Sequence, residues 1–306
     1  MTPPPKNMPA SIRERLRNLA RPDGSDFNLL LAAFATERFL YRLSQSKHAE
    51  LFVLKGARLF ALWSHKPHRP TRDLDLLGFG EPSPEALGKV IRDICRMEVI
   101  PDGLIFDEQS IHVEEIRVEH EYNGQRIRLV AHLQNARIPL QIDIGFGDAI
   151  TPEPQQAEYT ALLSSLPAPY IRVYPRETVI AEKLQAMVSL DVLNTRMKDF
   201  YDLCVLAREF DFDGPTLCQA IHATFERRKT DLPKEIPACL WETFPKRTDK
   251  RDLWAAFLQR AGLPDNREND FVAVHRELIE FLSLPLFAAA HPGDFNKMWT
   301  AGKGWV

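Results

Sequence analysis

The stretch that most constrains the fold of this chain runs from residue 53 to residue 77. It reads as the end of an apolar strand, a glycine turn at Gly56, a short helix, a basic loop and a second strand that carries Asp73 and Asp75. Residues i and i+2 of an extended strand point to the same face, about 6.6 Å apart along the chain. Asp73 and Asp75 therefore project together, while the leucines that alternate with them point into the core.

Two carboxylates on one face repel each other unless a cation lies between them. Mg²⁺ suits this arrangement because it prefers hard oxygen ligands and takes one or two carboxylates together with substrate phosphates. Five basic residues and no acidic ones lie between positions 55 and 72, namely Lys55, Arg58, Lys66, Arg69 and Arg72. A polyphosphate bound between the cations and the carboxylates accounts for both groups. The alternative is that Asp73 and Asp75 form the solvent face of an edge strand.

The glycine turn has a possible role of its own. Gly56 permits close approach of the backbone to a ligand, and a helix expected over 57–64 presents its N-terminal amides to an anion. A Lys-Gly pair is also an ordinary turn. The loop 65–71 contains two prolines, which indicates partial rigidity.

Composition narrows the class of protein. The chain has 306 residues, enough for two domains, and its contents of 44% hydrophobic and 26% charged residues are typical of a soluble globular protein. The net charge of −3 argues against a general nucleic-acid coat, although it permits a local basic groove over 55–72. The sequence contains neither an apolar run of membrane-spanning length nor an N-terminal signal segment. The four cysteines are scattered, which predicts reduced thiols in a cytoplasmic protein and neither a zinc site nor disulfides.

Helices are expected first, over 9–21 and 26–44, the second with Asp26 as its cap and with Glu37 and Arg38 either solvated or structural. The pattern then changes to period two. Strands are expected over 111–122, 126–133 and 138–146, with Asn123-Gly124 as a hairpin turn. Asp143 is a single carboxylate on the last of these strands. It is either a surface residue or a third ligand facing the Asp73 and Asp75 pair.

The second half of the chain reads as mainly helical. A Pro-rich polar stretch over 151–168 resembles a connection, so we expect an N-terminal lobe over 1–165 and a helical lobe over 166–306. The sequence does not decide whether the tail 285–306 packs on the body or serves a partner.

A second group of charged residues lies in this helical half. Lys183 follows Glu182 on one expected helix, and Asp199 and Asp202 lie three apart on another, so these two carboxylates share a helix face. One interpretation is that Asp199 positions Lys183, a nucleotide or an acceptor group. The other is a helix cap with a salt bridge to Arg196 or Lys198.

Taken in order, these pieces resemble the AbiEii/AbiGii-type nucleotidyltransferase toxins of type IV toxin–antitoxin systems. The matching segments are Leu54-Lys55-Gly56, Arg69-x-Thr71-x-Asp73-Leu74-Asp75, Ile142-Asp143-Ile144, Glu182-Lys183-x-x-Ala186 and Arg196-x-Lys198-Asp199-x-x-Asp202. They span residues 50 to 205. One departure is that relatives often carry Gly-Gly or Gly-Ser after the lysine, whereas this chain has Gly56-Ala57, so a phosphate contact there would depend on backbone amides.

The resemblance implies an α/β (α+β) fold, with a polymerase-β-like nucleotidyltransferase core on a mixed sheet and a helical C-terminal region. It also implies transfer of a nucleotide from an NTP with Mg²⁺, or Mn²⁺ in its place. Some members of the family modify tRNA, so an RNA acceptor is expected, together with a cognate antitoxin encoded nearby. No membrane partner is expected.

The roles implied for individual residues follow the same resemblance. The metal ligands are Asp73, Asp75 and Asp143, and these carboxylates together with Lys183 and Asp199 form the catalytic group. The nucleotide-binding residues are Lys55, Gly56, Arg69, Thr71, Lys183 and Asp202, the last of which also supports its helix.

Three other functions share parts of this pattern. A nucleotidyltransferase for a small molecule, such as an antibiotic or a metabolite, would have the same donor site with a small apolar acceptor groove. A non-catalytic nucleotide-binding or partner-binding module would lack NTP turnover. A metal nuclease is disfavoured because Asp143 lies far in sequence from Glu182 and Lys183.

Overall fold

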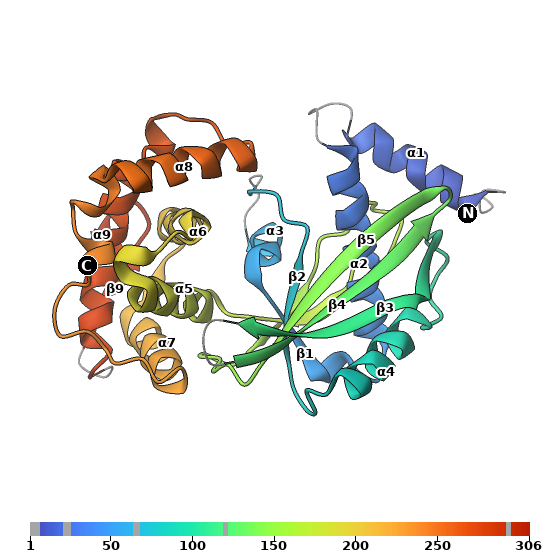
Figure 1. Ribbon diagram of the computed structural model, residues 1–306, viewed down its shortest axis with the longest axis horizontal. Coiled ribbons are helices and arrows are strands. Elements are labelled where there is room, and N and C mark those ends of the chain that lie inside the picture. The colour runs from blue at the N-terminus through green and yellow to red at the C-terminus, as the bar shows by residue number, and fades with distance from the viewer. Residues whose placement is uncertain (1–6, 21–25, 64–67, 119–121, 292–294) are drawn as a thin grey trace. The chain divides into compact units, whose positions relative to one another are not determined.

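The structure is a computed structural model that describes residues 7–20, 26–63, 68–118, 122–291 and 295–306 (Figure 1). The chain divides into two compact units. The first comprises Met1–Gly147 and Gln155–Val173, and the second Asp148–Pro154 and Tyr174–Val306. The boundary predicted between 165 and 166 lies inside the first unit, because the strand that follows it pairs with the sheet of that unit.

The first unit is built on a seven-stranded mixed sheet with the strand order β3-β4-β5-β2-β1-β7-β6. The pairs β2–β5 and β1–β7 are parallel, and the other four pairs are antiparallel. This confirms the predicted mixed sheet. The strands are β1 (Phe52–Lys55), β2 (Leu74–Gly78), β3 (Leu104–Val118), β4 (Tyr122–Leu133), β5 (Ala136–Phe146), β6 (Gln155–Glu158) and β7 (Tyr170–Val173).

The longer helices described in this unit are α1 (Met8–Ala20), α2 (Phe27–Gln45) and α4 (Pro84–Cys95). Helix α2 contacts β5 and β7, and α4 contacts β3. The side chain of Asp26 accepts a hydrogen bond from the Asn28 amide at 2.9 Å, so the predicted cap of α2 is confirmed. Alternate residues of the central strands, among them Leu54, Leu76 and Ile144, are buried and form the core of the unit.

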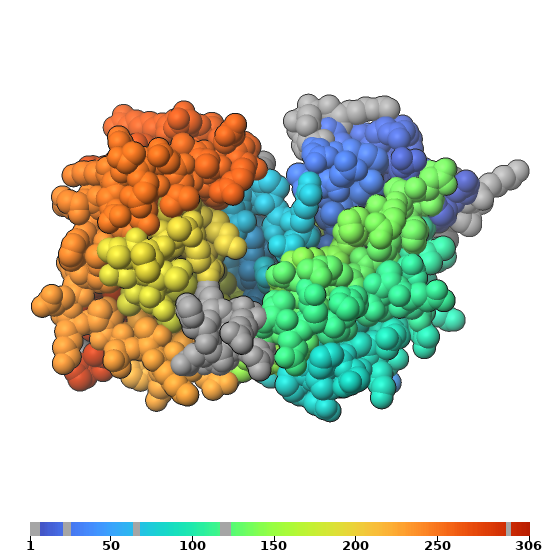
Figure 2. Space-filling model, in the orientation of Figure 1, coloured from blue at the N-terminus to red at the C-terminus, as the bar shows by residue number. Residues whose placement is uncertain are grey.

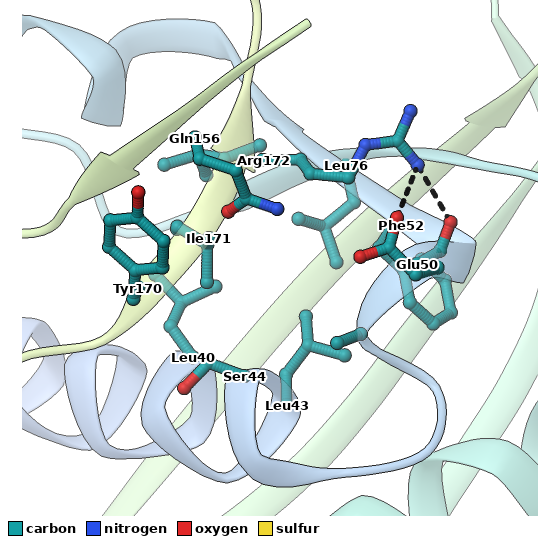
Figure 3. Close-up of a pocket in the computed structure, with 12 residues that line it drawn as sticks. Leu40, Leu43, Ser44, Glu50, Phe52, Leu76, Gln156, Tyr170, Ile171 and Arg172 are labelled. Carbon is teal, nitrogen blue, oxygen red and sulfur yellow. Dashed lines mark hydrogen bonds and ion pairs between the residues drawn. The ribbon is translucent and has the colours of Figure 1, made fainter.

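Close packing of this core leaves only a small cavity between α2 and strands β1, β2 and β7 (Figure 3). Its volume of about 20 Å³ has room for a single water molecule. The Arg172 guanidinium lies beside it and donates a hydrogen bond to the Glu50 carbonyl oxygen at 2.8 Å. The cavity is too small for a nucleotide and does not enter the functional site.

The predicted turn at Asn123-Gly124 is wrong. Both residues lie in β4, where they pair with Arg117 and Ile116 of β3. The chain reverses between Val118 and Tyr122, and residues 119–121 lie outside the described part of the chain. A long antiparallel ladder fixes the register here and outweighs the local turn preference of Asn-Gly.

Helix α2 buries charged residues that tie the Pro-rich stretch to the first unit. Glu37 and Arg38 are almost fully buried and pair with each other. Glu37 accepts a hydrogen bond from the Leu162 amide at 2.7 Å, and Arg38 donates one to the Pro167 carbonyl oxygen at 2.7 Å. Burial raises the pKa of Glu37, against the opposing effect of Arg38 and the amide. The stretch 151–168 is therefore not a simple connection, since it includes β6 and is anchored on α2.

The second unit is mainly helical, as predicted, with a three-stranded sheet in the order β10-β9-β8. The C-terminal tail packs on this unit: the Trp299 and Trp305 indoles donate hydrogen bonds to the carbonyl oxygens of Ala207 and Phe281, at 2.8 and 3.0 Å. None of the described helices is both long and apolar enough to cross a bilayer. The elements are α5 (Arg176–Leu190), α6 (Met197–Glu209), α7 (Gly214–Arg227), α8 (Thr248–Ala261), α9 (Phe271–Ala288), β8 (Phe212–Asp213), β9 (Met298–Thr300) and β10 (Gly304–Trp305).

Candidate functional site

A row of charged residues crosses five strands of the first unit. Residues at paired positions of neighbouring strands lie about 4.8 Å apart across the sheet and point to the same face. The register brings together Lys55 of β1, Asp75 of β2, Asp143 of β5, Arg126 of β4 and Glu114 of β3. We call these five residues the charged row. Part of β3 to β5, green in Figure 2, lies at the surface of this unit.

The row collects three of the residues that the sequence singled out. Asp75 and Asp143 occupy paired positions on parallel strands, and Lys55 pairs with Asp75 from the other side. Asp73 comes directly before β2 and is exposed, whereas Asp75 and Asp143 are half-buried. Asp73 and Asp75 thus lie at the N-terminal end of β2, and Asp143 lies within β5 at the position paired with Asp75.

Gly56 makes room for the carboxylate of Asp75. Its φ of +77° lies in the left-handed region, and a Cβ atom at this position would lie 2.8 Å from Cγ and 2.9 Å from Cβ of Asp75. The helix expected over 57–64 is found in a different form: a 3₁₀ helix (Gly56–Leu59) leads directly into an α-helix of four residues, α3 (Phe60–Trp63). The group that approaches the glycine is therefore the side chain of Asp75, and the helix is too short to offer an anion site at its N-terminus.

The loop before β2 is held in place by groups of this short helical segment. Arg58 is buried, and its guanidinium donates hydrogen bonds to the carbonyl oxygens of Asp73 at 3.0 Å and Arg72 at 3.2 Å. His68 stacks on Phe60 with ring centroids 3.9 Å apart. Arg58 thus acts on the loop backbone. The predicted nucleotide-binding residues Arg69 and Thr71 are half-buried in this loop, and the predicted basic residue Lys66 lies outside the described residues.

Asp143 is already bound by a residue that the sequence reasoning missed. The Arg126 guanidinium donates from Nε to Oδ1 at 2.8 Å and from Nη2 to Oδ2 at 2.7 Å, a two-pronged, charge-assisted contact. Hydrogen bonding to Asp143 raises the pKa of Arg126, and the charges of Asp73 and Glu114 contribute to the rise. The signal in the sequence was the period-two pattern of 126–133, which places Arg126 on the face opposite to its apolar neighbours.

The donor atoms suit a hard cation only in part. Among the residues that the structure describes, no three acidic, histidine or cysteine side chains are gathered closely enough to hold a metal ion as they lie. Asp73 and Asp75 nevertheless supply the one or two carboxylates that Mg²⁺ ordinarily takes, and the carboxylate of Asp75 occupies the space that a side chain at Gly56 would fill. The residues that could hold Mg²⁺ as they lie are therefore Asp73 and Asp75, because the third predicted ligand, Asp143, is bound by Arg126.

The second unit contains a separate cluster around Lys183 of α5. Its ammonium donates to Asp199 Oδ1 at 2.5 Å and to Asp202 Oδ2 at 2.8 Å, both on α6. The two carboxylate side chains are fully buried, and that of Lys183 is 13% exposed. Arg196 donates to the other oxygen of Asp199 at 2.6 Å. The predicted salt bridge from Asp199 to Arg196 is confirmed, and Asp199 also holds the Lys183 ammonium, whereas no side chain caps the start of α6.

The charges within this cluster decide the state of Asp199. Burial raises the pKa of Asp199, but the charges of Lys183 and Arg196 and the hydrogen bond from Lys183 outweigh it, so the pKa lies below its ordinary value. Asp199 is therefore ionised and acts as the fixed counterion of Lys183.

Glu182, which precedes Lys183, belongs to a different network. Its carboxylate lies 3.5 Å from the Arg228 guanidinium, which also contacts Asp148 at 3.2 Å. Burial, together with the charges of Glu182 and Asp148, raises the pKa of the enclosed Tyr174 hydroxyl. These contacts join α5 to α7 and give Glu182 a structural role.

A family model described as "Nucleotidyl transferase AbiEii toxin, Type IV TA system" matches residues 38–280. The chain belongs to the AbiEii family. The matched range includes every residue of the charged row and of the Lys183 cluster. AbiEii proteins are nucleotidyltransferase toxins of type IV toxin–antitoxin systems, so membership implies an antitoxin partner.

Two solved structures from Helicobacter pylori are similar to this AbiEii chain. JHP933 shares 17% sequence identity over 87% of this chain and 95% of its own, with a TM-score of 0.48. A putative nucleotidyltransferase shares 17% identity over 87% of this chain and 96% of its own, with a TM-score of 0.46. No curated protein matches the chain.

Proposed function

We propose that this AbiEii chain transfers a nucleotide from an NTP to a hydroxyl group of an RNA acceptor of the tRNA class. It does so with Mg²⁺, or Mn²⁺ in its place, as a cytoplasmic toxin controlled by an antitoxin encoded nearby. The observation that carries the proposal is the pairing of Asp75 with Asp143 on parallel strands, with Asp73 beside them and Gly56 shaped around the Asp75 carboxylate.

The charge of the substrate explains why both signs occur in one row. A triphosphate is repelled by carboxylates and attracted by the ammonium of Lys55 and the guanidinium of Arg69. Asp73 and Asp75 would hold Mg²⁺, which when bound would supply a Lewis acid that offsets the negative charge of the phosphates. Lys55 contributes a point charge and Arg69 a planar fork, while Thr71 offers a hydroxyl donor and Gly56 a backbone amide.

The reaction is an in-line displacement at the α-phosphorus. The acceptor oxygen forms the new bond to phosphorus, the bond to the β-phosphate oxygen breaks, and pyrophosphate leaves. Asp143, proposed as the third metal ligand, would also accept the proton of the attacking hydroxyl, while Asp73 and Asp75 would hold the metal. The catalytic effect is positioning together with stabilisation of the charge that develops on the phosphate.

We propose that Lys183 also neutralises phosphate charge. Its ammonium donates hydrogen bonds to Asp199 and Asp202, which fix its position. Asp199 and Asp202, both fully buried, then serve the nucleotide by holding Lys183 in one orientation.

The proposal is tested by incubating the protein with each α-³²P-labelled NTP, Mg²⁺ and total cellular RNA, followed by a denaturing gel. Asp75→Asn keeps the shape of the side chain and removes its charge. The matched control is Glu115→Gln, an exposed carboxylate on β3 whose partner is Gln125, so it points to the opposite face from the charged row. We expect label in a tRNA-sized band with one NTP, roughly 100-fold less of it for Asp75→Asn, and no change for Glu115→Gln.

The other outcomes distinguish the rival functions. Label on a small molecule would identify a small-molecule nucleotidyltransferase with the same donor site. Absence of any NTP turnover would favour a binding module. Full activity of a folded Asp75→Asn protein would refute the metal site at β2.

A further inference from the structure

The Arg126–Asp143 pair leaves Asp143 in a state that conflicts with its proposed role. Both carboxylate oxygens face the guanidinium at 2.7 and 2.8 Å. A guanidinium held this way repels a second cation at the same carboxylate, because like charges at contact distance disfavour each other. Asp143 therefore cannot serve a metal ion fully while Arg126 holds it.

We propose that Arg126 is a positioning residue that holds Asp143 until a divalent cation reaches Asp73 and Asp75. Binding of the cation then replaces the guanidinium at Asp143. This inference rests on the proposed metal-dependent transfer and adds to it a residue on β4, outside the segments that suggested the family.

The exposure of the pair makes such an exchange feasible. The side chains of Arg126 and Asp143 are 29% and 19% exposed. A second two-pronged pair in the same unit, Arg42 with Asp102, has similar distances of 2.6 and 3.0 Å but exposures of only 7% and 2%. Breaking an ion pair that water reaches costs little, whereas breaking a buried one leaves an uncompensated charge. The partly exposed Arg126–Asp143 pair can therefore give way to another cation, whereas the buried Arg42–Asp102 pair is suited to a permanent link.

The charged row also provides a second partner for the displaced guanidinium. Glu114 of β3 occupies the position paired with Arg126, on the side away from Asp143. Its carboxylate is 34% exposed and lies 2.6 Å from Arg128. Arg126 can therefore turn from Asp143 toward Glu114 without losing a carboxylate neighbour.

The experiment measures Mn²⁺ affinity without nucleotide, by the electron paramagnetic resonance signal of free Mn²⁺. Arg126→Gln removes the competing cation. Arg128→Gln is the matched control, because it removes the same charge two residues away on the same strand and face, where the partner is Glu114. We expect Arg126→Gln to bind Mn²⁺ roughly 5-fold to 30-fold more tightly than the wild type, and Arg128→Gln to change the affinity less than about 3-fold.

Two further variants separate competition from a general loss of charge. Arg126→Lys keeps the positive charge but loses the two-pronged geometry, so its Mn²⁺ affinity is expected between those of the wild type and Arg126→Gln. If circular dichroism shows Arg126→Gln to be unfolded, Arg126→Lys takes its place in the comparison. In an Asp143→Asn background, Arg126→Gln is expected to give no more gain than Arg128→Gln.

The inference is overturned if Arg126→Gln and Arg128→Gln change Mn²⁺ affinity equally, or if the gain persists in the Asp143→Asn background. In both cases Mn²⁺ binding by the wild type leaves the proposed metal site standing. Failure of the folded wild type and of Arg126→Gln to bind Mn²⁺ at all overturns the metal site itself, and this inference with it.

Discussion

Replacement of Gly56 by alanine tests whether the glycine is required because of Asp75. The backbone φ of +77° disfavours any side chain, and a Cβ atom would also overlap the Asp75 carboxylate. Gly80, in the same unit, separates the two effects. Its φ is +97°, and no atom lies within 4 Å of the position that a Cβ would occupy. Gly80→Ala therefore shows the backbone cost without the overlap.

The expected magnitudes follow from these two contributions. A positive φ costs an alanine about 1–2 kcal/mol, partly offset by about 0.4–1 kcal/mol because alanine has less freedom than glycine in the unfolded chain. Gly80→Ala should thus lower the free energy of unfolding by about 1 kcal/mol. Gly56→Ala should lower it by a further 1–3 kcal/mol or so, the usual range for overpacking a filled site.

The assay is urea unfolding of both variants, together with Mn²⁺ affinity. Gly56→Ala should also weaken Mn²⁺ binding, since the overlap displaces Asp75, whereas Gly80→Ala should leave it unchanged. In an Asp75→Gly background the overlap disappears, because both the carboxylate and the Cβ of residue 75 are removed, so the cost of Gly56→Ala should fall to that of Gly80→Ala. Equal costs for the two glycine variants in the wild-type background would refute the reasoning.

Two further predictions concern buried charges. Lys183→Met should lower the free energy of unfolding by about 3–5 kcal/mol at neutral pH, because the carboxylates that it holds stay buried. The folded-state pKa of Asp199 lies below its ordinary 3.8, so its stabilisation is present above that value and is lost as the pH falls through the lowered pKa. Urea titrations at falling pH should therefore show the deficit of the variant shrinking in acid, and a pH-independent deficit would contradict this. In thermal unfolding, Arg42→Met should lower the free energy of unfolding by about 3–5 kcal/mol, because Asp102 is left buried without its partner. Arg126→Met should lower it by about 1 kcal/mol or less, because Asp143 is partly exposed. Equal losses of stability would show that exposure does not separate the two pairs.

The sequence predicts the faces of the strands better than their order. That Asp75 points away from the buried Leu74 and Leu76 follows from the extended backbone alone, so a local pattern is sufficient. That Asp143 occupies the position paired with Asp75 depends on β2 lying beside β5, with the α4 helix and two strands between them in the chain. A parallel pairing between segments this far apart cannot be recognised from any short stretch of the sequence.

The partner of Asp143 also could not be predicted from the sequence. Arg126 and Arg128 share one face of β4 and look equivalent in the sequence. The register decides between them: Arg126 pairs with Asp143, and Arg128 with Gln141. That register follows from the tight connection between Leu133 and Ala136, because loop length fixes the pairing of a hairpin. The wrongly predicted turn at Asn123-Gly124 shows the converse, a local turn signal that lies within a paired strand.

The two ionic clusters differ in a way that separates their functions. Asp199 is fully buried between Lys183 and Arg196, so losing either cation would leave a charge away from water. Asp143 is partly exposed, so water and an incoming ion can reach it as the Arg126 contact breaks. The buried Lys183 cluster is suited to holding one side chain in one orientation, whereas the partly exposed Arg126–Asp143 pair is suited to being replaced by a ligand. Lys183 should therefore affect stability and activity together, while Arg126 should affect metal affinity with little change in stability.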